Sequence, residues 1–334
     1  MGRGCGQIHQ QYYVCGVGLD VCADSGGWAL PAFLETLVHG DLARCQAQEP
    51  VLALRFGSET VPAPDDGKLV YRSTKLGVFR TGRGFYLRCG ISSLDVNVAA
   101  GEGTGFLGPD FWEAPLESRR EFFLLALLML LRREGLYGLH ANGAVRNGRG
   151  VLFIGDSGCG KTTWTLACLA AGWRYLSDDA LLVRSTPDAA EVLAFRKGFS
   201  YDPMLAGRFP RLARAANGAP VAASRKRLGD LDSVFPGQFV ASCIPTKIFF
   251  PRIGPDKTSH FVPIGQTEAL KGMIGQSPGI MTQPEWARPQ LETLRQLAEQ
   301  ASAFELVSGA DVLEDPAAAA SLLEAAQWAR SWLN

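Results

Sequence analysis

The chain contains 334 residues, of which 47% are apolar and 20% are charged. This length predicts two domains, and the apolar content is sufficient for packed cores, which excludes a disordered protein. Lys plus Arg and Asp plus Glu each number 33, so the net charge is zero. A neutral chain has no general attraction to nucleic acid or to an anionic membrane, so neither is expected as a partner.

The N-terminal residues and the cysteines bear on localisation. Residues 1–6 lack the hydrophobic stretch of a secretion signal, and Gly6 stands where a myristoylation motif requires Ser or Thr. The longest apolar run, residues 122–131, has about half the length of a membrane span, so we expect a buried helix in a cytoplasmic protein. Eight cysteines occur without a C-x-x-C pair, which predicts free thiols rather than a zinc site or a disulfide framework.

Short β-type runs alternate with turn residues across the first 117 residues. This pattern predicts a β-rich N-terminal domain, mostly antiparallel, with one early helix near residues 31–37. No catalytic group stands out in this part of the sequence. The expected strands cover residues 51–56, 69–72, 77–80, 85–88 and 94–98.

A helix is expected to separate the two domains. Residues 118–121, Ser-Arg-Arg-Glu, fit a capping box that begins a helix, and the helix should run to about Glu134 and end at Gly135. We therefore place the domains at residues 1–117 and 118–334.

Beyond that helix, two apolar runs flank Asn147-Gly148, the strongest signal for a two-residue hairpin. With these two residues as the loop, Arg146 faces Arg149, and His140 comes opposite Gly155. This register places an imidazole at the start of the next motif. The alternative is a histidine at a strand end, bonded to a backbone group.

That next motif is a glycine-rich loop. Residues 155–162 match the pattern G-x-x-x-x-G-K-[ST] between an apolar strand at 151–154 and a helix expected at 162–171. Glycines let backbone N–H groups turn toward a polyphosphate, the lysine reaches the β- and γ-phosphates, and the hydroxyl suits Mg²⁺. The alternative is an ordinary glycine-rich turn before a core helix. The residues expected to bind nucleotide are Gly155, Asp156, Ser157, Gly158, Cys159, Gly160, Lys161, Thr162 and Thr163, and Cys159 is the one cysteine in a position of chemical interest.

Two adjacent acids, Asp178 and Asp179, follow a strand expected at residues 173–177. One helix and one return strand separate them from Lys161, so they are expected at the same sheet edge as the loop. Two carboxylates beside Mg²⁺ and ATP can divide the work: one holds the metal through Thr162 and water, and the other accepts a hydroxyl proton. The alternative is a surface turn with two solvated acids.

Basic residues recur at turn edges in the remaining chain, at residues 195–198 and 225–227, and are usually solvated. Arg252 is the best candidate among them for a phosphate contact, because it lies at the end of a strongly apolar strand, beside a Pro/Gly break. The end of the chain is expected to be helical, with core leucines at Leu291, Leu294 and Leu297 and a last helix that begins at Asp315-Pro316.

Residues 140–183 combine His-Ala-Asn-Gly, Gly-Asp-Ser-Gly-Cys-Gly-Lys-Thr-Thr and Leu-Ser-Asp-Asp. In these motifs the chain resembles the catalytic domain of bacterial HPr kinase/phosphorylase, and more closely the HPr-kinase-related proteins of biosynthetic gene clusters, including those for lasso peptides. The likeness covers residues 136–334. It implies an α/β fold, in which a phosphate-loop-containing HPr kinase/PEP carboxykinase-like catalytic domain follows the β-rich N-terminal domain.

The resemblance also implies a role for each matching residue. Two departures limit it: Thr163 stands where HPr kinases have Glu, and residues 194–198 lack the acid that their signature carries before an Arg-Gly pair. These departures argue against HPr as the substrate and against reversible phosphorylase activity. The implied roles are phosphate and Mg²⁺ binding for Lys161 and Thr162, catalytic base for Asp178, metal-side acid for Asp179, orientation of Asp178 or phosphate for His140, and an anion contact for Arg252.

The predicted function is therefore an ATP- and Mg²⁺-dependent kinase that phosphorylates a hydroxyl. The leading acceptor is a serine of a peptide or protein, such as a ribosomal peptide precursor, presented by the N-terminal domain. A small-molecule hydroxyl kinase and a non-catalytic, nucleotide-gated binding protein are the alternatives. The sequence leaves open the identity of the acceptor, ATP or GTP preference, reverse activity and a homo-oligomeric state.

Overall fold

The computed structural model describes residues 8–24, 29–37, 50–195, 199–213, 219–220, 227–229, 234–277 and 284–326. Residues 196–198 and 225–226, from the two basic stretches, lie outside these ranges. The fold is mixed α/β, and the chain divides into two compact units. The first is Met1–Tyr137 with Met281–Ala287, and the second is Gly138–Ile280 with Arg288–Asn334. The division therefore falls after Tyr137, later than the boundary expected after residue 117.

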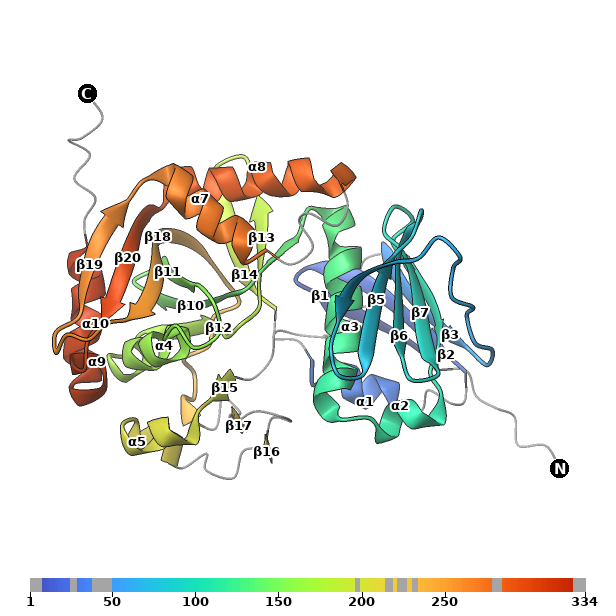
Figure 1. The fold of residues 1–334 in the computed structure, drawn as a ribbon, viewed down its shortest axis with the longest axis horizontal. Coiled ribbons are helices and arrows are strands. Elements are labelled where there is room, and N and C mark those ends of the chain that lie inside the picture. Colours follow the sequence, from blue (N-terminus) through green and yellow to red (C-terminus); the bar gives the residue numbers. More distant parts are fainter. Residues whose placement is uncertain are drawn as a thin grey trace. The chain divides into compact units, whose positions relative to one another are not determined.

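The first unit contains an eight-stranded mixed sheet in the order β1-β2-β3-β8-β7-β6-β5-β4 (Figure 1). β3 pairs in parallel with β2 and β8, and the other neighbours are antiparallel. All five expected strands are present, and β1, β2 and β8 were not expected. The strands are β1 (Ile8–Val14), β2 (Val17–Ala23), β3 (Leu52–Gly57), β4 (Lys68–Arg72), β5 (Leu76–Arg80), β6 (Gly84–Cys89), β7 (Ser92–Asn97) and β8 (Glu102–Phe106).

The apolar helix α3 (Leu116–Leu131) packs on this sheet against β6 and β7, which is why it belongs to the first unit. The capping-box prediction is wrong: Pro115 is the N-cap, and Ser118 lies inside the helix. A proline fixes its own φ and lacks the N–H group, so it sets the helix start itself. The end is as expected, with Gly135 at φ +69 after η2 (Arg132–Glu134). Among its described residues the unit also has two short helices, α1 (Leu30–Leu34) and α2 (Pro109–Glu113).

The second unit contains a nine-stranded sheet, and its hairpin of β10 (Ala141–Arg146) and β11 (Arg149–Ile154) has the expected register, with Arg146 opposite Arg149. Asn147 and Gly148 have φ values of +51 and +76, as a type I′ turn requires. β18 (Ser242–Ile253) lies parallel to β11 on one side and to β20 (Ser302–Ser308) on the other. The remaining strands of this sheet are β9 (Tyr137–Leu139), β12 (Arg174–Ser177), β13 (Leu181–Ser185), β14 (Ala190–Ala194) and β19 (His260–Ile264).

Helices cover both faces of this sheet (Figure 1). α4 (Lys161–Ala170), α9 (Asp311–Glu314) and α10 (Pro316–Ala325) share one apolar cluster with Phe153, Phe249 and Phe304 of the sheet. α7 (Gln266–Gly275) and α8 (Pro284–Gln300) share the other, which includes the expected core leucines Leu294 and Leu297. Asp315 caps α10 as expected. A smaller group holds β15 (Phe199–Tyr201), β16 (Ala219–Pro220), β17 (Arg227–Gly229), η3 (Pro203–Gly207) and α5 (Pro210–Ala213).

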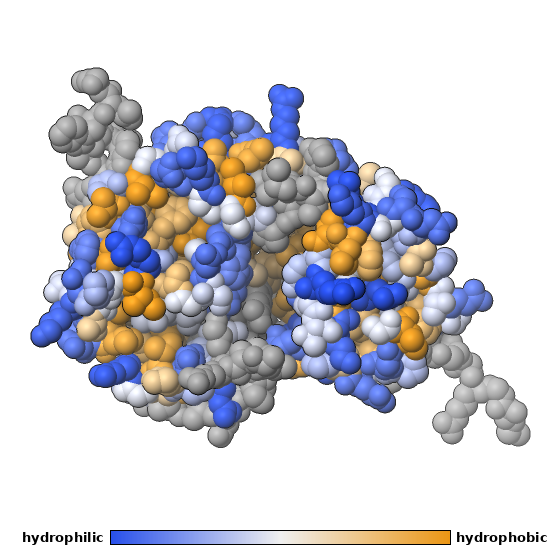
Figure 2. Space-filling view, viewed as in Figure 1, coloured by the Kyte–Doolittle hydropathy of each residue, from blue (hydrophilic) through white to orange (hydrophobic). Residues whose placement is uncertain are grey.

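The surface agrees with the balanced composition. On the visible face in Figure 2, coloured hydrophobic residues form patches that hydrophilic residues interrupt. Within the described part of the chain, none of the helices has the length and apolar character needed to cross a bilayer. The described cysteines are thiols rather than disulfides, as expected.

Candidate active site

The glycine-rich loop, residues 155–160, connects β11 to α4 at the end of the central strands. Gly158 and Gly160 have φ values of +88 and +107, which L side chains rarely adopt. Gly160 is the N-cap of α4, and no side chain caps the helix there. The first backbone N–H groups of α4 are therefore available to an anion, which the positive end of the helix dipole also favours.

Lys161 is the first residue of α4, and it is only 5% exposed. Its Nζ atom donates to the carbonyl oxygens of Gly155 at 2.7 Å and Asp156 at 3.1 Å. The same Nζ atom lies 3.2 Å from the Nε2 atom of His140. These partners are all neutral, so a nearly buried positive charge has its hydrogen bonds but no counter-ion among them. Together with the uncapped helix end, this donor set fits a polyphosphate.

His140 takes the place that the hairpin register predicted, beside Gly155 and the lysine. Its Nδ1 atom lies 2.9 Å from the carbonyl oxygen of Asp179, to which only an N–H can donate. Nε2 is then the acceptor for the Lys161 ammonium, and the imidazole is neutral. The 3.9 Å approach of Nε2 to the Asp179 carboxylate is therefore not an ion pair. The histidine bonds a backbone group, as the alternative predicted, and also lies against the lysine, whereas its place beside phosphates stays a prediction.

Asp178 is buried at 1% exposure and held from three directions. Its Oδ1 atom accepts a hydrogen bond of 2.5 Å from Asn142 and one of 3.3 Å from the Thr162 hydroxyl. Its Oδ2 atom accepts from the backbone N–H of Ser200 at 2.7 Å. The carboxylate therefore has a fixed orientation, directed at the hydroxyl that follows Lys161.

Asp179 forms the corner between β12 and β13. Its φ of +62 is left-handed, which costs free energy for a residue other than glycine and persists only where neighbours enforce it. Asn142 accepts from the Asp179 N–H at 3.1 Å, and His140 donates to its carbonyl oxygen. The corner is thus held on both sides, and its side chain keeps 20% of its surface exposed.

These contacts add to the site predicted from the sequence. His140 bonds the backbone of Asp179, and its orientation of Asp178 or phosphate stays a prediction. Asn142, which is fully buried and bonds both acids, was absent from the predicted site. The signal that could have identified Asn142 is an amide side chain within the strand β10, at a fully buried position. A buried polar group requires hydrogen-bond partners.

Other predicted residues lie around this centre. Asp156 accepts a hydrogen bond of 2.7 Å from Gln276, which follows α7, and Gln276 also accepts from the His140 backbone N–H at 2.7 Å. Ser157 is exposed, whereas Cys159 and Thr163 are half-buried. Arg252 forms an ion pair with Glu305 of β20, and its contact with an anion stays a prediction.

Comparison with known proteins gives little to add. No family model matches the chain, and no curated protein matches it. Among solved structures, the HPr(Ser) kinase/phosphatase from Coxiella burnetii is similar at 13% identity and a TM-score of 0.31. The match covers 56% of this chain and 94% of that one. A score this low carries no functional argument, so the function must be inferred from the site itself.

Proposed function

We propose that this chain is an ATP- and Mg²⁺-dependent kinase that transfers the γ-phosphoryl group to a hydroxyl, with a serine of a peptide or protein as acceptor. The observation that carries the proposal is the Lys161 ammonium, which is nearly buried among neutral acceptors at an uncapped helix N-terminus. Beside it lies a hydroxyl that bonds a buried carboxylate. A phosphate anion would supply the missing negative charge.

The residues for nucleotide and metal follow from this arrangement. Residues 155–160 and the first turn of α4 would hold the phosphates through backbone N–H groups, with Lys161 on the β- and γ-phosphates. Thr162 and Asp178 offer hard oxygen ligands for Mg²⁺ and its water. Bound ATP supplies the phosphoryl group, and Mg²⁺ neutralises part of its charge.

The geometry favours exchanging the two roles expected from the sequence, which were catalytic base for Asp178 and metal-side acid for Asp179. Asp178 already accepts three hydrogen bonds and bonds Thr162, so it is suited to the metal side. Asp179 is partly exposed, and its Oδ1 atom lies 3.9 Å from the Nε2 atom of His140. We therefore assign the proton acceptor to Asp179.

In the proposed step, Asp179 takes the proton from the acceptor hydroxyl, and the freed oxygen forms a bond to the γ-phosphorus. The bond from that phosphorus to the β,γ-bridging oxygen breaks, and ADP keeps the electron pair. Neutral His140 keeps Lys161 at the loop without adding a second positive charge. Serine phosphate and ADP are the products, and the proton stays on Asp179 until solvent removes it.

Lys161→Ala tests this function against a matched lysine. Lys247 also places its ammonium on two backbone carbonyls, those of Leu323 and Glu324 in α10. We expect Lys161→Ala to lower phosphoryl transfer to a serine-peptide library by at least about a hundredfold and to weaken Mg²⁺-ATP binding. Lys247→Ala should lower stability alone.

Three outcomes would change the proposal. Equal transfer by the Lys161→Ala variant and the parent would remove the glycine-rich loop from the reaction. Labelling of small hydroxyl compounds alone would make the protein a small-molecule kinase. Tight nucleotide binding with no transfer to any acceptor would make it a nucleotide-gated binding protein.

A further inference from the structure

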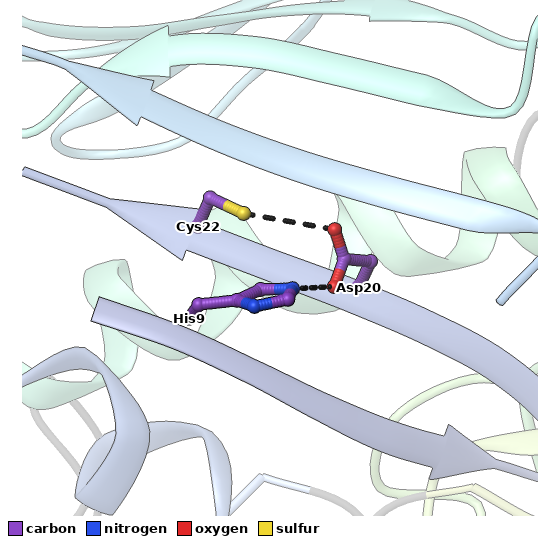
Figure 3. Close-up of side chains that lie close together, drawn as sticks. All are labelled: His9, Asp20 and Cys22. Atoms are coloured by element: carbon purple, nitrogen blue, oxygen red, sulfur yellow. Dashed lines mark hydrogen bonds and ion pairs between the residues drawn. The ribbon is translucent and has the colours of Figure 1, made fainter. Parts of the chain in front are cut away.

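A second cluster of chemically active side chains lies in the first unit, on the β1–β2 pair (Figure 3). His9 of β1 stands directly opposite Cys22 of β2 in the antiparallel register. Asp20 precedes Cys22 by two positions, so its side chain lies on the same face of the sheet. One ligand atom from each residue can be chosen so that all three lie within 4.8 Å of one another.

The distances can be compared with those around a tetrahedral zinc ion. Zinc bonds of 2.0–2.3 Å to N, O and S predict ligand separations of about 3.4–3.6 Å. The Cys22 Sγ atom lies 3.6 Å from Asp20 Oδ2, which already meets this requirement. The His9 Nε2 atom lies 2.5 Å from the other carboxylate oxygen, Asp20 Oδ1. Zinc binding therefore requires the imidazole to retreat by about 0.9 Å, and the carboxylate must either turn one oxygen toward both neighbours or bind through both oxygens. The His9 side chain is 60% exposed and has the freedom to retreat.

We propose that His9, Asp20 and Cys22 form a zinc site that fastens the edge strand β1 to β2. Imidazole, thiolate and carboxylate are the donor types that zinc takes, whereas Mg²⁺ and Ca²⁺ avoid sulfur. Three protein ligands leave the fourth position to water. The Cys22 thiol gives up its proton to solvent when the metal binds.

Arg55 of β3 is the group that the metal must replace. Its Nη1 atom lies 3.8 Å from Asp20 Oδ2 and 4.0 Å from the Cys22 sulfur. The guanidinium therefore neutralises the same carboxylate that the metal would bind. Since the Arg55 side chain is 52% exposed, it can turn into solvent when a cation arrives. Either the Arg55 guanidinium or a zinc ion from solution can therefore neutralise the Asp20 carboxylate.

The test is Zn²⁺ titration of the untagged, nucleotide-free protein against a chromophoric chelator. We expect one Zn²⁺ per chain, with affinity lowered at least about tenfold by Cys22→Ser or His9→Gln. Arg55→Met should tighten binding, because it removes the competing cation. Cys15→Ser is the matched control, since Cys15 lies in the β1–β2 turn outside the cluster and should leave affinity unchanged. Asp179→Asn separates this site from the candidate active site and should also leave it unchanged.

Cobalt substitution identifies the sulfur ligand directly. A sulfur-to-cobalt charge-transfer band should appear in the parent and the Cys15→Ser variant, and it should be lost in Cys22→Ser. The proposal is overturned if the parent binds no Zn²⁺, if Cys22→Ser binds it as tightly as the parent, or if Arg55→Met weakens binding.

Discussion

Asn142→Leu is the sharpest perturbation of the candidate active site. The side chain is fully buried, and leucine has a similar size and shape, so the change removes two hydrogen bonds with little change in packing. The Asp178 carboxylate would lose a donor at 2.5 Å, and the Asp179 N–H would lose its acceptor at 3.1 Å.

The expected cost follows from these two losses. A hydrogen bond to a charged group contributes about 1.5–3 kcal/mol, and an unsatisfied buried N–H costs about 1–3 kcal/mol. The free energy of unfolding should therefore fall by about 2.5–6 kcal/mol in urea denaturation. If the whole free energy of the hydrogen bond to Asp178 is added to the activation barrier, phosphoryl transfer should fall by about 10- to 150-fold.

Two further variants separate the causes. Ser177→Ala removes a part-buried hydrogen bond to the Ala180 carbonyl in the same turn and leaves Asn142 with its contacts to both acids. It should lower the free energy of unfolding by about 0.5–1.5 kcal/mol and leave phosphoryl transfer unchanged from that of the parent. Asn142→Asp keeps an acceptor for Asp179 and places a second carboxylate against Asp178, so the pair should share a proton. The folded Asn142→Asp variant then binds protons more tightly than its unfolded state. Its loss of unfolding free energy relative to the parent should therefore shrink as the pH falls, unlike that of Asn142→Leu.

The reasoning fails if Asn142→Leu is folded and transfers phosphate within about twofold of the parent, a change of less than half a kcal/mol in the barrier. It also fails if Ser177→Ala lowers transfer as much as Asn142→Leu does. Either result would show that Asn142 does not hold the acids for catalysis.

Three other predictions concern the same protein. Asp179→Asn should lower transfer by about two to four orders of magnitude at unchanged Mg²⁺ requirement, whereas Asp178→Asn should raise the Mg²⁺ concentration needed for half-maximal transfer; identical behaviour of the two variants would reject the assigned roles. Trp164→Phe removes the 2.8 Å hydrogen bond to Ser308 and should lower the free energy of unfolding by about 1–3 kcal/mol, and prior replacement of Ser308 by Ala should reduce that loss. If the first unit presents the peptide by strand addition at the sheet edge, amide hydrogen exchange in β4 should slow when the acceptor binds, and unchanged exchange would point to another binding surface.

The sequence predicted the parts of the site that depend on local chemistry. Asn147-Gly148 determines the turn, and the turn determines the register that brings His140 beside Gly155. Gly158 and Gly160 have a left-handed backbone, and their position in a loop between a strand and a helix accounts for it. These features are set within a few tens of residues of one another, where spacing carries most of the information.

Contacts between distant strands could not be predicted in the same way. The pairing of Arg252 with Glu305 depends on β18 and β20 lying side by side, and no spacing rule announces it. The same limit applies to the zinc proposal. The scattered cysteines argued against a zinc site, whereas the ligands of the proposed site include one cysteine and come together only through the pairing of β1 with β2, neither of which was expected.

The structure contradicts one interpretation of the paired acids, a surface turn with two solvated carboxylates, and their catalytic roles stay a proposal. A solvated surface turn would expose both carboxylates. Instead Asp178 is 1% exposed, and Asp179 has a left-handed φ. Asn142 and His140 bond the backbone of Asp179 on both sides, and Asn142 also bonds the Asp178 carboxylate. Since the two side chains come from one strand and the residue just before it, the β10–β11 turn that sets the lysine loop also sets the acid corner. A left-handed residue other than glycine costs stability whatever its use, and such residues cluster at functional sites, which is the physical argument for a hypothesis of chemistry at this position.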